Sequence, residues 1–109
     1  MRIPKRFKLL GFTIEVTKDP TMMQDRNWRG AADYEEMSIR LQPISEAFKS
    51  STERVEQTFC HELMHHLAYH AGDTINHMLP DDKYLHQQEA FIDLMGSLLH
   101  QALTTMEYD

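Results

Sequence analysis

Residues 59–66 read Phe59-Cys60-His61-Glu62-Leu63-Met64-His65-His66 and lie within a longer segment, about 51–71, whose apolar residues recur at helical spacing. Ser50 precedes Glu53 by three residues, the spacing of an N-terminal capping box, and Gly72 is suited to end the helix. Successive residues of a helix are rotated by about 100°, which places several apolar side chains on one broad arc of its surface. We assign this arc to the core; it comprises Phe59, Cys60, Leu63, Met64, Leu67 and Ala68.

The same segment contains the pattern His-Glu-x-x-His, formed by His61, Glu62 and His65. Side chains four residues apart lie on one face of a helix, so both imidazoles can reach one metal ion at the edge of the apolar arc. Zinc accepts imidazole nitrogen and carboxylate oxygen, and a catalytic zinc site keeps one position open for water. Glu62 lies beside such a site and can take a proton from that water. The alternative is that His61 and His65 are ordinary histidines on a helix.

A catalytic zinc site needs a third protein ligand, and a second pattern lies downstream, on a helix expected over about 83–103. Residues 86–93 read His-Gln-Gln-Glu-Ala-Phe-Ile-Asp, in which Glu89 and Asp93 are four residues apart and share a face. On the alternative interpretation, Glu89 is an exposed charge favoured by the helix dipole, and Asp93 is a surface carboxylate.

Together, the two patterns resemble those of the gluzincins, the thermolysin-like zincins, in which Glu-Ala-x-x-Asp follows His-Glu-x-x-His on a second helix. The resemblance implies that Glu89 is the third zinc ligand. His86, one turn earlier on roughly the same face, is a competing third ligand by position. The resemblance also implies that Asp93 accepts a proton from one ligand histidine, His61, and fixes its orientation. Short single-domain members are known as minigluzincins, and peptidases encoded by phages and mobile elements carry a similar Glu-Ala pattern.

The resemblance covers mainly residues 50–100 and leaves one thermolysin-like feature without a counterpart. No second subdomain is expected to supply the His or Tyr that stabilises the oxyanion, and the possible substitutes are Tyr69, Tyr84 and Tyr108. Residues 37–42 take the place of the edge strand along which an extended peptide substrate adds. By resemblance to minigluzincins, Glu107 or Asp109 in the acidic tail could fold back onto the open zinc position.

In the first half of the chain, apolar and polar residues alternate with the two-residue period of β-strands. Residues 7–17 predict a half-buried strand that ends at Asp19-Pro20, a turn or short strand is expected near Gly30, and residues 37–42 predict a strand that ends at Pro43. A polar loop follows the first long helix and contains Asp73, Thr74, Pro80, Asp81 and Asp82. The expected fold is α+β, a zincin-like single domain over residues 1–109 with a small twisted sheet, an active-site helix and a glutamate-bearing helix.

Three further histidines and three other residues have structural interpretations. His66 and His70 are expected on the polar surface, and His100 is expected beyond reach of the metal. Gly96 is expected to permit close helix packing, and Trp28 is interpreted as a partly buried core aromatic rather than a cleft residue. Cys60 is the single cysteine, which excludes an internal disulfide.

The composition of the chain limits the kinds of partner that it can bind. The net charge of −6 at pH 7 argues against nucleic acid, since phosphate binding needs a basic surface. Neither a signal peptide nor a run of 18 apolar residues is visible, so a soluble cytoplasmic protein with no membrane partner is expected. The oligomeric state stays open.

These observations favour a zinc-dependent peptidase that acts on a peptide or protein, with Glu62 as the general base. Two alternatives from other classes remain. One is a catalytically weak or latent protein of zincin fold with a regulatory or binding role. The other is a metal-free α+β interaction domain.

Overall fold

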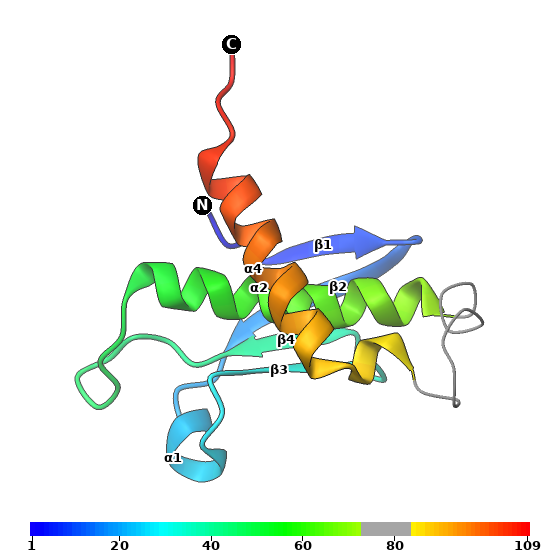
Figure 1. Ribbon diagram of the computed structural model, residues 1–109. Helices are drawn as coiled ribbons and strands as arrows, with labels where there is room; N and C mark the ends of the chain where they lie inside the picture. Colours follow the sequence, from blue (N-terminus) through cyan, green and yellow to red (C-terminus); the bar gives the residue numbers. More distant parts are fainter. Residues whose placement is uncertain (73–83) are drawn as a thin grey trace.

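The computed structural model, which describes residues 1–72 and 84–109, places the strands first along the chain and the two long helices after them (Figure 1). The elements are β1 (Arg6–Leu9), β2 (Phe12–Lys18), α1 (Met22–Arg26), β3 (Gly30–Asp33), β4 (Ser38–Leu41), α2 (Thr52–His70), the 3-10 turn η1 (Leu85–Gln87) and α4 (Glu89–Thr105). They form one small α+β domain, as predicted. The expected polar loop of residues 73–82 lies outside the described residues. No helix within the described ranges is both long enough and apolar enough to cross a membrane.

Strand β4 is an interior strand of the four-stranded sheet, whose order is β1-β2-β4-β3. It pairs in parallel with β2, where Ile39 faces Val16, and antiparallel with β3, where Ile39 faces Ala32. The expectation that residues 37–42 form an edge strand is therefore wrong. Because β3 adds to the far side of β4, the free edge on that side belongs to the short strand that the sequence suggested near Gly30.

The strand predicted over residues 7–17 is a hairpin. Leu10 and Gly11 have φ values of 50° and 82°, and two successive positive φ values are typical of a two-residue type I′ turn. On either side of this turn β1 and β2 pair antiparallel, with Leu9 opposite Phe12. In β2 the predicted alternation holds from Ile14 onward, because Ile14 is buried while its neighbours are exposed.

The main core lies between the sheet and α2. Ile14, Ile39 and Leu41 from the sheet pack with Phe59 and Cys60 of α2, and all five are nearly or fully buried. A second cluster joins α2 to the C-terminal part of the chain through Ala68, Leu85 and Ile92. The assignment of Phe59, Cys60 and Ala68 to the core is confirmed.

Helix α2 begins one residue later than the predicted capping box. The Oγ of Ser51, not of Ser50, accepts a hydrogen bond of 3.1 Å from the backbone N–H of Arg54. This satisfies one of the first-turn N–H groups that have no partner within the helix.

His66 is fully buried, which contradicts its assignment to the polar surface. Its Nε2–H donates to the carbonyl oxygen of Ser38 at 2.8 Å, and Tyr34 packs edge-on against its ring. The polar-surface expectation fails because α2 is covered on one side by the sheet and on another by α4, so its buried surface is wider than the apolar arc. His70 is half-buried, with its ring stacked on those of His66 and Phe12.

Helix α4 lies across α2 on the side away from the sheet (Figure 1). It begins at Glu89 rather than near Lys83, because residues 85–87 form the separate turn η1. At Gly96 the two backbones nearly touch: a Cβ on this glycine would lie 2.9 Å from the Cα of His61 and 3.1 Å from its backbone nitrogen. The predicted role of Gly96 in close helix packing is confirmed.

This crossing makes the effect of Gly96→Ala a test of the packing. Helix propensity alone would stabilise the protein by about 1 kcal/mol. Overpacking against the His61 backbone costs about 1–3 kcal/mol, so we expect a net loss in the free energy of unfolding by urea. A control variant, Gln101→Ala, changes an exposed side chain of the same helix and should have little effect. A more stable Gly96→Ala protein would show that the helices are not in contact here.

Candidate metal centre

His61, His65 and Glu89 form a group that could hold a metal ion, because one ligand atom from each lies within 4.8 Å of the others. The Nε2 of His61 lies 3.2 Å from one carboxylate oxygen of Glu89, and the Nε2 of His65 lies 2.9 Å from the other. Ligand atoms around a tetrahedral ion with bonds of about 2.0–2.1 Å are roughly 3.3 Å apart. The donor atoms that the two motifs predicted are therefore brought together at a spacing that fits a small divalent ion.

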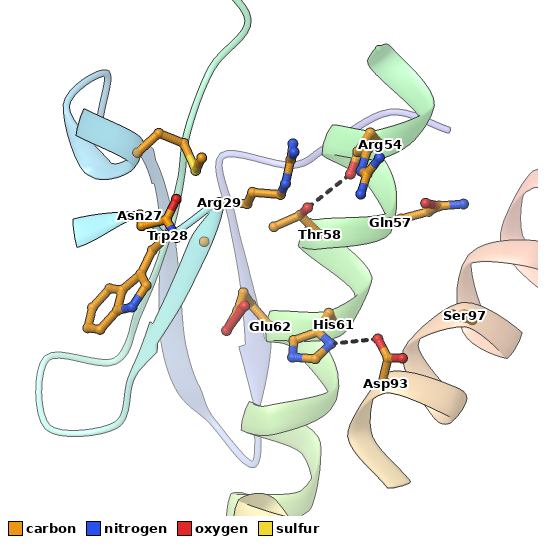
Figure 2. Close-up of a pocket in the computed structure, with 12 residues that line it drawn as sticks. Asn27, Trp28, Arg29, Arg54, Gln57, Thr58, His61, Glu62, Asp93 and Ser97 are labelled. Carbon is orange, nitrogen blue, oxygen red and sulfur yellow. Dashed lines mark hydrogen bonds and ion pairs between the residues drawn. The ribbon is translucent and has the colours of Figure 1, made fainter. Parts of the chain in front are cut away.

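The second ring nitrogen of each histidine faces its own acceptor. The Nδ1 of His61 lies 3.5 Å from Asp93 (Figure 2), and the Nδ1–H of His65 donates to the backbone carbonyl of His86 at 2.7 Å. Such partners hold the ring and favour the tautomer that leaves Nε2 free as an acceptor, which is the form that binds a metal. The chemistry of the donor set therefore fits a metal ion.

Burial differs sharply among the three groups. The side chains of His61 and His65 are 24% and 11% exposed, whereas that of Glu89 is 67% exposed. Glu89 is the first residue of α4, where a negative charge is also favoured by the helix dipole. The site consequently has a shielded side formed by α2 and a side open to solvent.

Glu62 is buried next to this group. It is only 8% exposed, and burial raises the pKa of its carboxyl to about 7, with the charge of His61 opposing that rise and the charge of Glu89 adding to it. A Cβ on Gly30 of the edge strand would lie 3.1 Å from the Cγ of Glu62 and 2.7 Å from a methyl carbon of Thr58. The absence of a side chain at Gly30 therefore lets β3 pass close to Glu62.

A cleft of about 560 Å³ opens beside His61 and Glu62 (Figure 2). Its walls come from the segment leading into β3, from the N-terminal half of α2 and from α4, which contributes Asp93 and Ser97. Trp28 forms part of one wall and is 45% exposed, so its interpretation as a core aromatic is wrong. It precedes the strand instead of lying beneath it.

The other histidines that the structure describes do not join the metal-ligand group. His86 contributes its backbone carbonyl, while its ring packs among Tyr34, Tyr69 and Tyr84, and burial lowers its pKa. His100 is buried further along α4 and pairs with Glu56 at 3.1 Å, consistent with its expected distance from the metal ligands.

The C-terminal tail leaves α4 at the end opposite Glu89 (Figure 1). The helix has 17 residues and spans about 25 Å at ~1.5 Å per residue. The tail of residues 106–109 reaches at most about 14 Å when extended. With α4 intact, neither Glu107 nor Asp109 of the same chain can reach the ligand group, so the expected fold-back is wrong for this arrangement. Tyr108, on the same tail, is equally remote.

Tyr34 lies near the candidate site, with its ring packed edge-on against that of His86, and the sequence did not single it out. It follows β3, stacks on Tyr69 with ring centroids 4.4 Å apart, and its pKa is raised to about 12 by burial and by the carboxylates of Glu62 and Glu89. Its hydroxyl is therefore within electrostatic reach of both groups and stays protonated near neutral pH. No motif marks this residue, since only the pairing of β3 with β4 brings it to α2.

Comparison of the chain with protein-family models, curated proteins and solved structures finds no match to any of them. The site is therefore interpreted from its own residues.

The contact between Asp93 and His61 gives a direct test of the metal centre. We expect Asp93→Asn to weaken Zn²⁺ affinity by about 10–100-fold, because the amide orients the imidazole less strongly than a carboxylate does. Competition with a chromophoric chelator measures this affinity. Glu107→Gln removes an exposed carboxylate far from the site and should leave it unchanged. Equal Zn²⁺ affinities for Asp93→Asn and the unmodified protein would show that Asp93 does not support metal binding through His61.

Proposed function

We propose that this protein is a zinc-dependent peptidase of zincin-like fold, in which His61, His65 and Glu89 hold the metal and Glu62 is the general base. The observation that carries the proposal is the convergence of three ligand side chains from two helices beside a buried fourth carboxylate and an open cleft. The order of sheet, histidine helix and glutamate helix supports it, because the resemblance to gluzincins implies the same order.

The character of the site favours catalysis over a structural role for the metal. Structural zinc sites are closed by four protein ligands, whereas catalytic sites have three and an open position. Within the described ranges, three candidate ligands converge; the side chain of Glu89 is 67% exposed, and His61 also lines the cleft. This leaves room for water and a substrate carbonyl.

An extended peptide is expected to add along the free edge of β3. The outer edge of Gly30–Asp33 carries backbone groups that no other strand pairs with in the described sheet. Main-chain hydrogen bonds to such an edge hold a peptide in one register, and Gly30 brings this edge close to Glu62. In this proposal β3 takes the place that the resemblance gave to residues 37–42.

In this proposal, the steps of peptide hydrolysis are carried out by the bound metal and one side chain. When bound, zinc supplies Lewis-acid polarisation of the scissile carbonyl and of a water molecule. Glu62 takes a proton from the attacking water and returns it to the leaving amine nitrogen, so that the peptide C–N bond breaks and a carboxylic acid and an amine are formed. Glu62 lines the cleft but is only 8% exposed, which limits the access of bulk water to the proton that it carries.

Tyr34 is the proposed hydrogen-bond donor to the oxygen that becomes negative during attack. A donor for this task must be protonated, and a pKa of about 12 keeps the phenol so. Tyr69 and Tyr84 are less suited. Tyr69 is the stacking partner of Tyr34, and Tyr84 packs on His86.

Replacement of the general base is the main test of this function. We expect Glu62→Gln to lower kcat/KM on a cleaved peptide by about 10²–10⁴-fold, because the amide cannot accept the proton, while Zn²⁺ affinity is retained. The assay is mass-spectrometric detection of products from a mixed peptide library, with and without a chelator. Zinc binding without hydrolysis of any library member by the unmodified protein would favour the non-catalytic alternative.

The role of Tyr34 is tested by Tyr34→Phe, which keeps the stacked ring. Loss of one donor to the developing oxyanion should lower kcat by about 10²–10³-fold with little change in KM. Tyr84→Phe is the matched control, because it removes a hydroxyl from the same aromatic cluster. If the two variants have the same kcat, Tyr34 has only a packing role.

A further inference from the structure

The cleft has a basic end that the proposed chemistry does not use. Arg29 and Arg54 line it together with His61 and Glu62. Figure 2 shows both guanidinium groups at the end nearest the first turns of α2, with His61 and Glu62 towards the other end. The two arginines come from different elements, since Arg29 directly precedes β3 and Arg54 lies in the first turn of α2.

Neither guanidinium has a carboxylate partner among residues 1–72 and 84–109. Among the described residues, the carboxylates paired with arginine are Glu15, with Arg6, and Asp19, with Arg40. Arg29 is half-buried and lies over the ring of Phe48 at 5.1 Å, which holds its charge in place without cancelling it. In a chain with a net charge of −6, two cations that pair with no carboxylate of the described residues and lie beside one cleft are suited to an anionic group from outside.

The distance from the metal ligands limits where that group lies in a substrate. Arg54 precedes His61 by seven residues, which is about 10 Å along a helix. An extended peptide advances about 3.3 Å per residue. A substrate passing from the metal centre to the basic end therefore reaches it about three residues from the scissile bond.

We propose that Arg29 and Arg54 recognise a carboxylate of the peptide substrate about three residues from the bond that is cleaved. The inference rests on the proposed peptidase function and assigns a substrate class to it. Guanidinium groups bind carboxylates through paired N–H donors, so one carboxylate can contact both arginines. The carboxylate is either an acidic side chain or the C-terminus of the peptide, and the test separates the two.

The first experiment compares matched peptides built on a sequence that the protein cleaves. Glutamate or glutamine is placed at each position up to four residues from the scissile bond, in peptides with an amidated C-terminus. A second series carries no acidic side chain and ends at these positions in a free carboxylate or an amide. We expect kcat/KM to be roughly tenfold higher for the carboxylate member at one position near the third residue. This ratio should shrink at high ionic strength.

The arginines are then tested by the same ratio. Arg29→Gln with Arg54→Gln should bring the ratio of carboxylate to neutral peptide close to one. Arg6→Gln is the matched control, because it removes one positive charge from β1 at the opposite edge of the sheet and should preserve the ratio. A ratio near one for the unmodified protein at every position, or a ratio unchanged in the double variant, overturns the inference while the peptidase function stands.

A binding experiment separates this inference from the proposed function if no peptide is hydrolysed. The ¹⁵N–¹H resonances of arginine Nε are followed while an acetylated, amidated alanine hexapeptide with one glutamate, or its glutamine counterpart, is added. Selective shifts of Arg29 and Arg54 with the glutamate peptide would support a carboxylate site in a protein that is not a peptidase. Equal effects of the two peptides would exclude it.

Discussion

The close crossing of α2 and α4 is the constraint on which the rest of the structure depends. Helix α4 presents to α2 a stripe of residues spaced three or four apart, which are Glu89, Asp93, Gly96 and His100. Their contacts on α2 run in the opposite order, from His65 through His61 to Glu56. Because the glycine lets the two backbones nearly touch, side chains on either side of it reach across the interface. The same helix packing that buries the core thus sets the spacing of the ligand atoms.

The far end of this interface is held by a buried hydrogen bond between the side chains of His100 and Glu56. Glu56 and His100 are 10% and 8% exposed and lie 3.1 Å apart, and the N-terminal ammonium of Met1 lies 3.1 Å from the same carboxylate oxygen. Burying such groups costs much of what their attraction returns, so the pair adds little net stability. A buried Glu56 carboxylate without a partner would be costly, however, and the observed register of α4 on α2 brings His100 to it. We infer that the pair fixes this register, and with it the position of Glu89 over the histidines.

The candidate metal-ligand group could be predicted from the sequence because the His61–His65 pair depends on local periodicity, while Glu89 was implied by the resemblance to gluzincins. His61 and His65 share a helix face wherever that helix packs, and the same holds for Glu89 and Asp93. The predictions that were wrong concern features that depend on the pairing of segments distant in the sequence. Which strand forms the free edge is decided by β3 adding beside β4, and the burial of His66 is decided by the sheet that covers it. Tyr34 is brought to the site by that same pairing and carries no motif.

Zinc X-ray absorption spectroscopy on the metal-loaded protein tests the central claim most directly, since it reports the atoms around the metal in solution. Our account predicts one tightly bound zinc per chain with two imidazole nitrogens and carboxylate or water oxygens at about 2.0–2.1 Å. It also predicts no sulfur at about 2.3 Å, because Cys60 is buried in the core. A spectrum with a sulfur ligand, or with fewer than two imidazoles, would contradict the convergence of the two helices on one ion.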